Sequence, residues 1–217
     1  MHRLLGCKKI TYDTNCVIFY CLNTSLKSKN GNFVEINYGD KTKKAQELTT
    51  WFCSRGGIVF LRYCAKEIEE ETVAQSIVKD FANNPTILKK LDMQREGMPY
   101  LIQNQIQNSF FKKFDKLKRY PWFEINDDFK PPPDILRSID NYFRYEMKSS
   151  KSLLDRLSFS KKKHPIPDIT DQIFLAFTYC SKIVGITHDS SVYSYQKELK
   201  DKNLCGEVFD LMSLKKI

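Results

Sequence analysis

The sequence predicts an α/β fold: a three-layer α/β/α arrangement with a central, mostly parallel sheet and a helical insertion. Short apolar runs of strand length alternate with helical segments over 8–83 and again over 168–211. Between them, 84–165 keeps helical spacing without a run of strand type. Such alternation is typical of parallel sheets with right-handed crossovers. We therefore predict a single domain over 1–217, with a basic helical insertion at about 84–165.

Four short runs are predicted as strands. The run 58–63 (IVFLRY) is continuously apolar, as expected of a strand buried on both faces. It follows Gly56-Gly57, a pair that interrupts regular structure. The polar, Lys-rich stretch 25–44 is predicted as a loop. The other strand candidates are 8–12, 182–187 and 206–211.

Helices are predicted over much of the remaining chain. Five apolar residues of the insertion recur at helical spacing and predict one amphipathic helix: Ile102, Ile106, Phe110, Phe114 and Leu117. The prolines at 131–133 break the chain, and Asp134 is predicted to N-cap a second long helix over 135–159. A basic, Pro-containing linker follows at 160–167. The other helix candidates are 16–22 (a helix or a turn), 45–53, 65–81 and a segment with Asp171 in its first turn.

The charge of the chain is unevenly distributed. The formal net charge is +9, and 84–165 holds 17 Lys and Arg against 10 Asp and Glu. A basic segment on a nearly neutral scaffold suggests a polyanionic partner, although any one Lys run also fits a solvated helix face. The candidate phosphate contacts are Lys112, Lys113, Lys116, Arg119, Lys161, Lys162 and Lys163.

Several classes of protein are disfavoured by composition. No run approaches the roughly 20 apolar residues that span a bilayer, and the N-terminus lacks the apolar core of a signal peptide. The seven cysteines are scattered without a CxxC pair, which argues against a disulfide framework and against a zinc site of usual spacing. We expect a soluble protein of the reducing cytoplasm, with no membrane partner.

Four acidic residues are predicted at the ends of regular elements. In an open parallel sheet, ligands bind beyond the carboxyl ends of the strands. Each acid alone also fits a helix cap or a first helical turn. Together, close carboxylates repel one another, and Mg²⁺ or Mn²⁺ would relieve the repulsion and activate a water for phosphodiester hydrolysis. The four residues are Asp13, Glu67, Asp171 and Asp189.

The order of these motifs resembles the PIN-domain ribonuclease superfamily, to which VapC-type toxins belong. The motifs are YDTN at 12–15, AKEI at 65–68, DQIFLAF at 171–177 and GITHD at 185–189. The resemblance implies a PIN-like sheet and an Mg²⁺ or Mn²⁺ site formed by the same four acids. Asn15 and Thr187 match residues that support such a site. It also implies an RNA substrate and, for a toxin, an antitoxin protein; relatives are often homodimers.

The sequence departs from the family pattern at three places. The 103 residues between Glu67 and Asp171 exceed what a compact toxin needs. Glu70 and Glu71 share a predicted helical face with Glu67, so any of the three could be the second ligand. Two serines follow Asp189 where relatives often offer a further acid.

Two residues and the function of the protein allow more than one interpretation. Asp168 is interpreted as an N-cap rather than an outer ligand, and His188 as a solvent-exposed turn residue. The alternative functions are a non-catalytic nucleic-acid-binding or scaffold protein on a PIN-like fold, and a DNA nuclease of the flap type.

Overall fold

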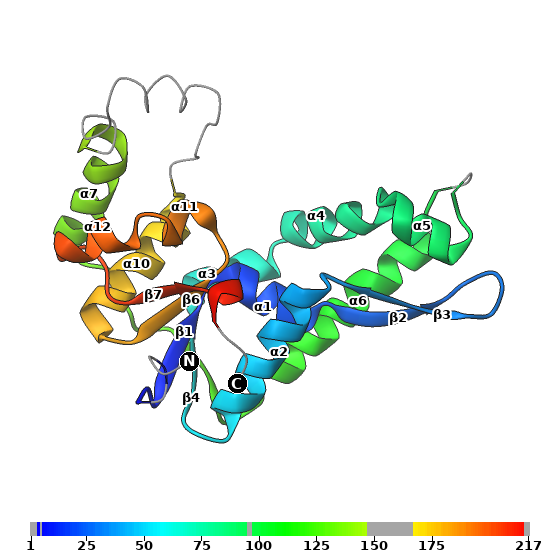
Figure 1. The fold of residues 1–217 in the computed structure, drawn as a ribbon, viewed down its shortest axis with the longest axis horizontal. Helices are drawn as coiled ribbons and strands as arrows, with labels where there is room; N and C mark the ends of the chain where they lie inside the picture. Colours follow the sequence, from blue (N-terminus) through cyan, green and yellow to red (C-terminus); the bar gives the residue numbers. More distant parts are fainter. Residues whose placement is uncertain (1–3, 5, 95–96, 147–166, 215–217) are drawn as a thin grey trace.

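The computed structural model describes residues 4, 6–94, 97–146 and 167–214 (Figure 1). Its centre is a sheet of five strands, all paired in parallel and flanked by helices. The strands are β1 (Lys9–Tyr12), β4 (Gly57–Leu61), β5 (Phe123–Asn126), β6 (Val184–Thr187) and β7 (Val208–Asp210). Their order across the sheet is β5-β4-β1-β6-β7. The predicted α/β class with a parallel central sheet is confirmed.

The three inner strands end at one edge of the sheet. Every residue of β4 is buried, which matches its apolar run. Tyr12, the last residue of β1, pairs with Phe60 on one side and with Ile186 on the other. Because the three strands are parallel and in this register, the residues that follow them emerge side by side.

Helices lie on both sides of the sheet in Figure 1, with α1 and α2 to one side and α7 and α10 to the other. Among the described residues, no helix is long and apolar enough to cross a membrane. The helices in the described part of the chain are α1 (Thr14–Cys21), α2 (Asp40–Cys53), α3 (Arg62–Glu69), α4 (Glu71–Ala82), α5 (Pro85–Leu91), α6 (Tyr100–Leu117), α7 (Pro133–Asn141), the π-helix η1 (Tyr142–Glu146), α10 (Ile169–Ser181), α11 (Ser190–Tyr193), α12 (Gln196–Asp201) and the 3₁₀-helix η2 (Leu211–Ser213).

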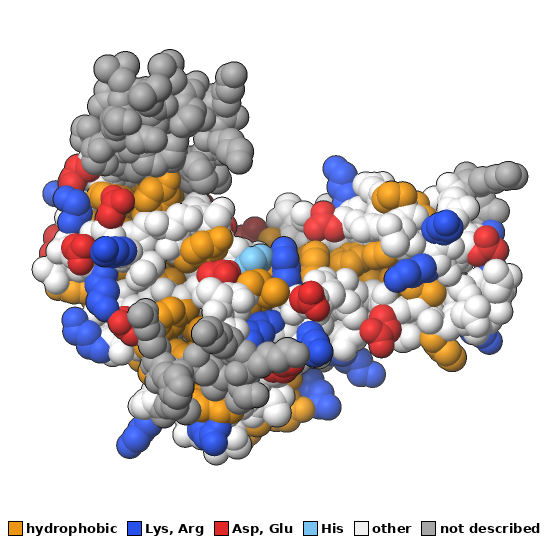
Figure 2. Space-filling view, viewed as in Figure 1, with side chains coloured by type: hydrophobic (Ala, Val, Ile, Leu, Met, Phe, Trp, Pro, Cys, Tyr) orange, Lys and Arg blue, Asp and Glu red, His pale blue; other side chains and the backbone are white. Residues whose placement is uncertain are grey.

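An arm extends from one side of this body. It consists of α4, α5 and α6 together with an antiparallel hairpin, β2 (Asn23–Lys27) and β3 (Phe33–Asn37) (Figure 1). Among the described residues on the face in Figure 2, Lys and Arg side chains on the arm are mixed with Asp and Glu. On this face the positive charge of the arm is therefore dispersed rather than gathered into one patch.

The predicted loop over 25–44 is wrong, because this stretch contains the hairpin and the start of α2. Gly31 turns the chain with a φ of 84°, in the region that favours glycine. Alternate residues of β3 are buried, Val34 and Ile36 among them, as expected of a strand that packs with one face.

The prediction that 84–165 contains helices without strands is also wrong. Residues of β5 extend the central sheet, with Phe123 paired to Ile58. Asp134 is not the N-cap of the following helix: Pro132 holds that position and Pro133 begins α7, because proline suits the first helical turn. The helix predicted to reach 159 is described only to Glu146, and 147–166 lies outside the described residues.

The predicted helix 65–81 is two helices. The backbone of Glu70 is extended, with a ψ of 133°, and separates α3 from α4. The strand predicted at 206–211 is present as β7, and the strand predicted at 58–63 ends at Leu61 because Arg62 begins α3.

Candidate functional site

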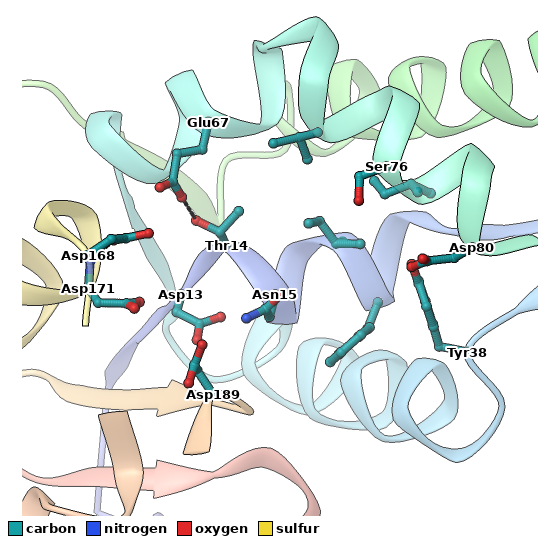
Figure 3. A pocket seen from close by; sticks show the side chains of 14 residues that line it. Asp13, Thr14, Asn15, Tyr38, Glu67, Ser76, Asp80, Asp168, Asp171 and Asp189 are labelled. Atoms are coloured by element: carbon teal, nitrogen blue, oxygen red, sulfur yellow. Dashed lines mark hydrogen bonds between the residues drawn. The ribbon is translucent and has the colours of Figure 1, made fainter. Parts of the chain in front are cut away.

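A cavity of about 390 Å³ opens where the inner strands of the sheet end. It is lined by residues from α1, α3, α4, the start of α10 and the turn after β6 (Figure 3). Among the lining residues that the structure describes, six are acidic and none is Lys or Arg. All four predicted acids line it, together with two more. The acidic residues are Asp13, Glu67, Asp80, Asp168, Asp171 and Asp189.

Asp13 lies at the centre of this cluster, immediately after β1, and only 3% of its surface is exposed. It is the N-cap of α1: its Oδ1 accepts a hydrogen bond of 3.1 Å from the amide of Cys16. The hydroxyl of Thr187 donates to its Oδ2. Burial raises the pKa of Asp13 to about 6, and the charge of Asp189 adds to the rise. The hydrogen bonds from Thr187 and Cys16 act in the opposite direction and lower this pKa.

Asp171 lies in the first turn of α10 and lines the same cavity as Asp13. Asp168 is the N-cap of that helix and accepts a hydrogen bond of 3.0 Å from the Asp171 amide, as predicted. Burial raises the pKa of Asp171 to about 8, and the carboxylates of the cluster add to the rise, Asp168 first and then Asp13. A carboxyl group with this pKa exchanges its proton near neutral pH, which is typical of functional sites.

Glu67 reaches the cavity from α3. The hydroxyl of Thr14 donates to its carboxylate (Figure 3). Burial raises the pKa of Glu67, and hydrogen bonds from Thr14 and Thr170 lower it. Of the glutamates that the sequence left open, Glu70 does not line the cavity, and the side chain of Glu71 lies outside the described residues.

Asp189 completes the cluster from the turn after β6. It is the N-cap of α11, and its Oδ1 accepts a hydrogen bond of 2.7 Å from the Ser191 amide. Its own amide donates to Thr187 Oγ1 at 2.9 Å. Thr187 therefore joins Asp13 to the Asp189 turn. Asn15 lines the cavity beside them, and its backbone helps to lower the pKa of Asp13.

The donor set of the cavity suits a hard divalent cation in type, because it consists of carboxylate and hydroxyl oxygens. As the side chains stand, however, no group of three or more Asp, Glu, His or Cys in the described chain is arranged to hold a metal ion. Several carboxylate oxygens instead accept hydrogen bonds from Thr14, Thr187 and helix amides. A metal ion would thus require side-chain rotation, and it would offset the mutual repulsion of the carboxylates, which adds to the effect of burial in raising the pKa of Asp171.

Four of the predicted phosphate contacts are described in the structure, and none of these four lines the cavity. Lys112 and Arg119 are exposed on α6 or just after it. Lys113 is half-buried and donates to the carbonyl of Asn23, and Lys116 lies with it at a second cavity. Lys161, Lys162 and Lys163 lie outside the described residues.

Other residues of the site did not stand out in the sequence. Thr14 lies inside the YDTN motif, which could have revealed it, whereas Asp80 reaches the far end of the cavity from α4 and accepts a hydrogen bond of 3.2 Å from Tyr38. His188 is not the exposed turn residue that was predicted. Its Nδ1 lies 2.8 Å from Asp210 Oδ1, and its ring packs edge-on against Phe19.

Comparison with known proteins identifies no family for this chain. No family model matches it, and no curated protein matches it. The fold and the acidic cavity are therefore the observations from which a function is inferred.

Proposed function

We propose that this protein is a metal-dependent nuclease of the PIN type that hydrolyses phosphodiester bonds of RNA. One observation carries the proposal: acids from four separate segments converge in one open cavity at the carboxyl edge of a parallel sheet. Ordinary helix caps do not require that convergence. The resemblance of the four motifs to PIN-domain ribonucleases suggests the reaction that the converging acids would support, which is metal-dependent hydrolysis of RNA.

The residues of the cavity would have separate roles. Asp13, Glu67, Asp171 and Asp189 would hold Mg²⁺ or Mn²⁺, which would supply a water nucleophile at neutral pH and stabilise charge on the phosphate. Thr187 positions Asp13 through its hydroxyl. Thr14 does the same for Glu67. Asp171, with a pKa of about 8, would release its proton when the cation binds.

A second candidate is a non-catalytic nucleic-acid-binding or scaffold protein. It is favoured by the hydrogen bonds that already hold the carboxylates, since the described side chains form no ready metal site. The repulsion among the close carboxylates argues against it, because a protein without a metal-dependent activity gains nothing from holding them together. A DNA nuclease of the flap type would use the same chemistry, so both polymers belong in the test.

The deciding experiment incubates labelled single-stranded RNA and DNA with the protein and Mn²⁺ or Mg²⁺, with EDTA as the blank. Wild type is compared with Asp13→Asn and Asp171→Asn, which keep size and remove charge. Asp80→Asn is the matched control, because it makes the same change at the far end of the same cavity. We expect metal-dependent RNA cleavage that falls about 10²-fold or more in both cluster variants and stays within about threefold in the control.

Two results would overturn the proposal. If wild type cleaves neither polymer with either metal, the protein is not this kind of nuclease. If cleavage survives both cluster substitutions, the acidic cavity is not where it occurs. Cleavage of DNA alone would keep the site and replace the substrate.

A further inference from the structure

A second cavity, of about 360 Å³, lies between α1, α2 and the end of α6. It shares no lining residue with the acidic cavity. Its size falls in the range of roughly 300–1,000 Å³ typical of small-ligand pockets. The lining residues are Tyr20, Gln46, Thr50, Lys113, Lys116 and Tyr120.

The charge of this second cavity is positive. Its described lining contains two ammonium groups and no carboxylate. Lys113 is half-buried, and its Nζ donates to the backbone carbonyl of Asn23. Within the described part of the chain, neither Lys113 nor Lys116 forms an ion pair. A half-buried charge without a counter-ion is costly, and an anion in the cavity would offset that cost.

The other lining residues of the second cavity are of types that bind an aromatic base and a sugar. Tyr20 and Tyr120 present phenol rings, and Lys116 lies over the Tyr120 ring at 6.0 Å from its centroid. Tyr120 is itself stacked on Trp122, with ring centroids 4.9 Å apart and an interplanar angle of 15°. Gln46 and Thr50 add an amide and a hydroxyl. Aromatic rings beside cations are the combination that binds bases and phosphates in single-stranded nucleic acids.

We propose that this cavity binds one nucleotide, with Lys113 and Lys116 on the phosphate and Tyr120 against the base. The nucleotide could come from two sources, a free mononucleotide or one unit of an RNA chain. The proposal does not depend on cleavage at the acidic cavity, because the two cavities share no residue.

The test measures binding in EDTA, so that no metal-dependent cleavage interferes. The probes are inorganic phosphate, 5′-AMP and a short 2′-O-methylated oligoribonucleotide. Because the chain has two tryptophans, a Trp51→Phe background leaves Trp122 to report events at Tyr120 by fluorescence. In this background Lys113→Met and Lys116→Gln are compared with Lys43→Gln, an exposed lysine on α2 that does not line the cavity.

We expect Lys113→Met to weaken binding about tenfold and Lys43→Gln to change it less than about twofold. Binding of 5′-AMP with this pattern identifies a free nucleotide, and binding of the oligomer alone with this pattern identifies a unit of RNA. If circular dichroism shows that the Lys113→Met variant does not fold, the Lys116→Gln variant is compared with the control in its place. The proposal is overturned if wild type binds none of the three probes at millimolar concentration, or if Lys43→Gln weakens binding as much as the cavity variants.

Discussion

Asp171→Asn should make the metal-free protein more stable at neutral and basic pH. The pKa of Asp171 is about 8 in the folded chain against a usual 3.8, because burial and neighbouring carboxylates disfavour its charge. A raised pKa means that the folded state binds this proton more tightly than the unfolded state. The associated stability is present below about pH 4 and is lost as the pH rises to about 8. Asn carries no charge, so the variant escapes the loss.

The size of the effect follows from the two pKa values. The difference between 3.8 and about 8 corresponds to roughly 6 kcal/mol of unfolding free energy, at about 1.36 kcal/mol for each tenfold change in proton affinity. Part of this is shared with Asp13, whose charge contributes to the rise and which titrates over an overlapping range. We therefore expect a gain of about 2–4 kcal/mol at pH 8, and of less than about 0.5 kcal/mol at pH 4.

The assay is urea or thermal unfolding in EDTA at pH 4, 6 and 8. For a chain of this length, the expected gain at pH 8 raises Tm by about 5–15 °C. Asp80→Asn, exposed at the far end of the cavity, should leave Tm within about 2 °C at each pH. Added Mn²⁺ should stabilise wild type more than the Asp171→Asn variant. A variant that is less stable than wild type at pH 8, or equally stable at every pH, would refute this reasoning.

Two further substitutions test the supports of the site. Thr187→Val removes the hydroxyl that donates to Asp13 and accepts from the Asp189 amide; it should cost about 1–3 kcal/mol in urea unfolding at pH 7, and a loss below about 0.5 kcal/mol would contradict this. Gly56→Ala would place a Cβ 1.4 Å from the Lys8 carbonyl oxygen, so we expect a loss of more than about 3 kcal/mol or failure to fold, whereas Gly6→Ala, in open space, should be nearly neutral.

The inner strands were predictable because they are buried on both faces, and β4 shows this in a continuous apolar run. The edge strand β5 was not. Only Phe123 of its four residues is buried, and its partner β4 lies far away in the sequence. Nothing in a four-residue window distinguishes such a strand from a loop. The hairpin, in contrast, did carry a signal: Asn30-Gly31 between alternating apolar residues is a common turn sequence.

The candidate site was predictable to the extent that it follows element ends. Asp13 and Asp189 could be placed by the strands before them, and Asp168 by its capping position. Asp80 could not, since only the packing of α4 against α3 and α6 brings it to the cavity. The break at Glu70 has no proline or glycine to mark it, so the sequence did not show that Glu67 lines the cavity and Glu70 does not.

Two helices, α1 and α10, begin at the acidic cavity and point their amide ends into it. The N-terminus of a helix carries about half of a positive elementary charge. The backbone therefore supplies part of the counter-charge that lets several carboxylates coexist in a folded chain. The same helix ends repel a cation, so the orientation that lets the carboxylates coexist without a metal would also weaken their binding of one. An ion bound under this compromise would exchange readily with the solvent.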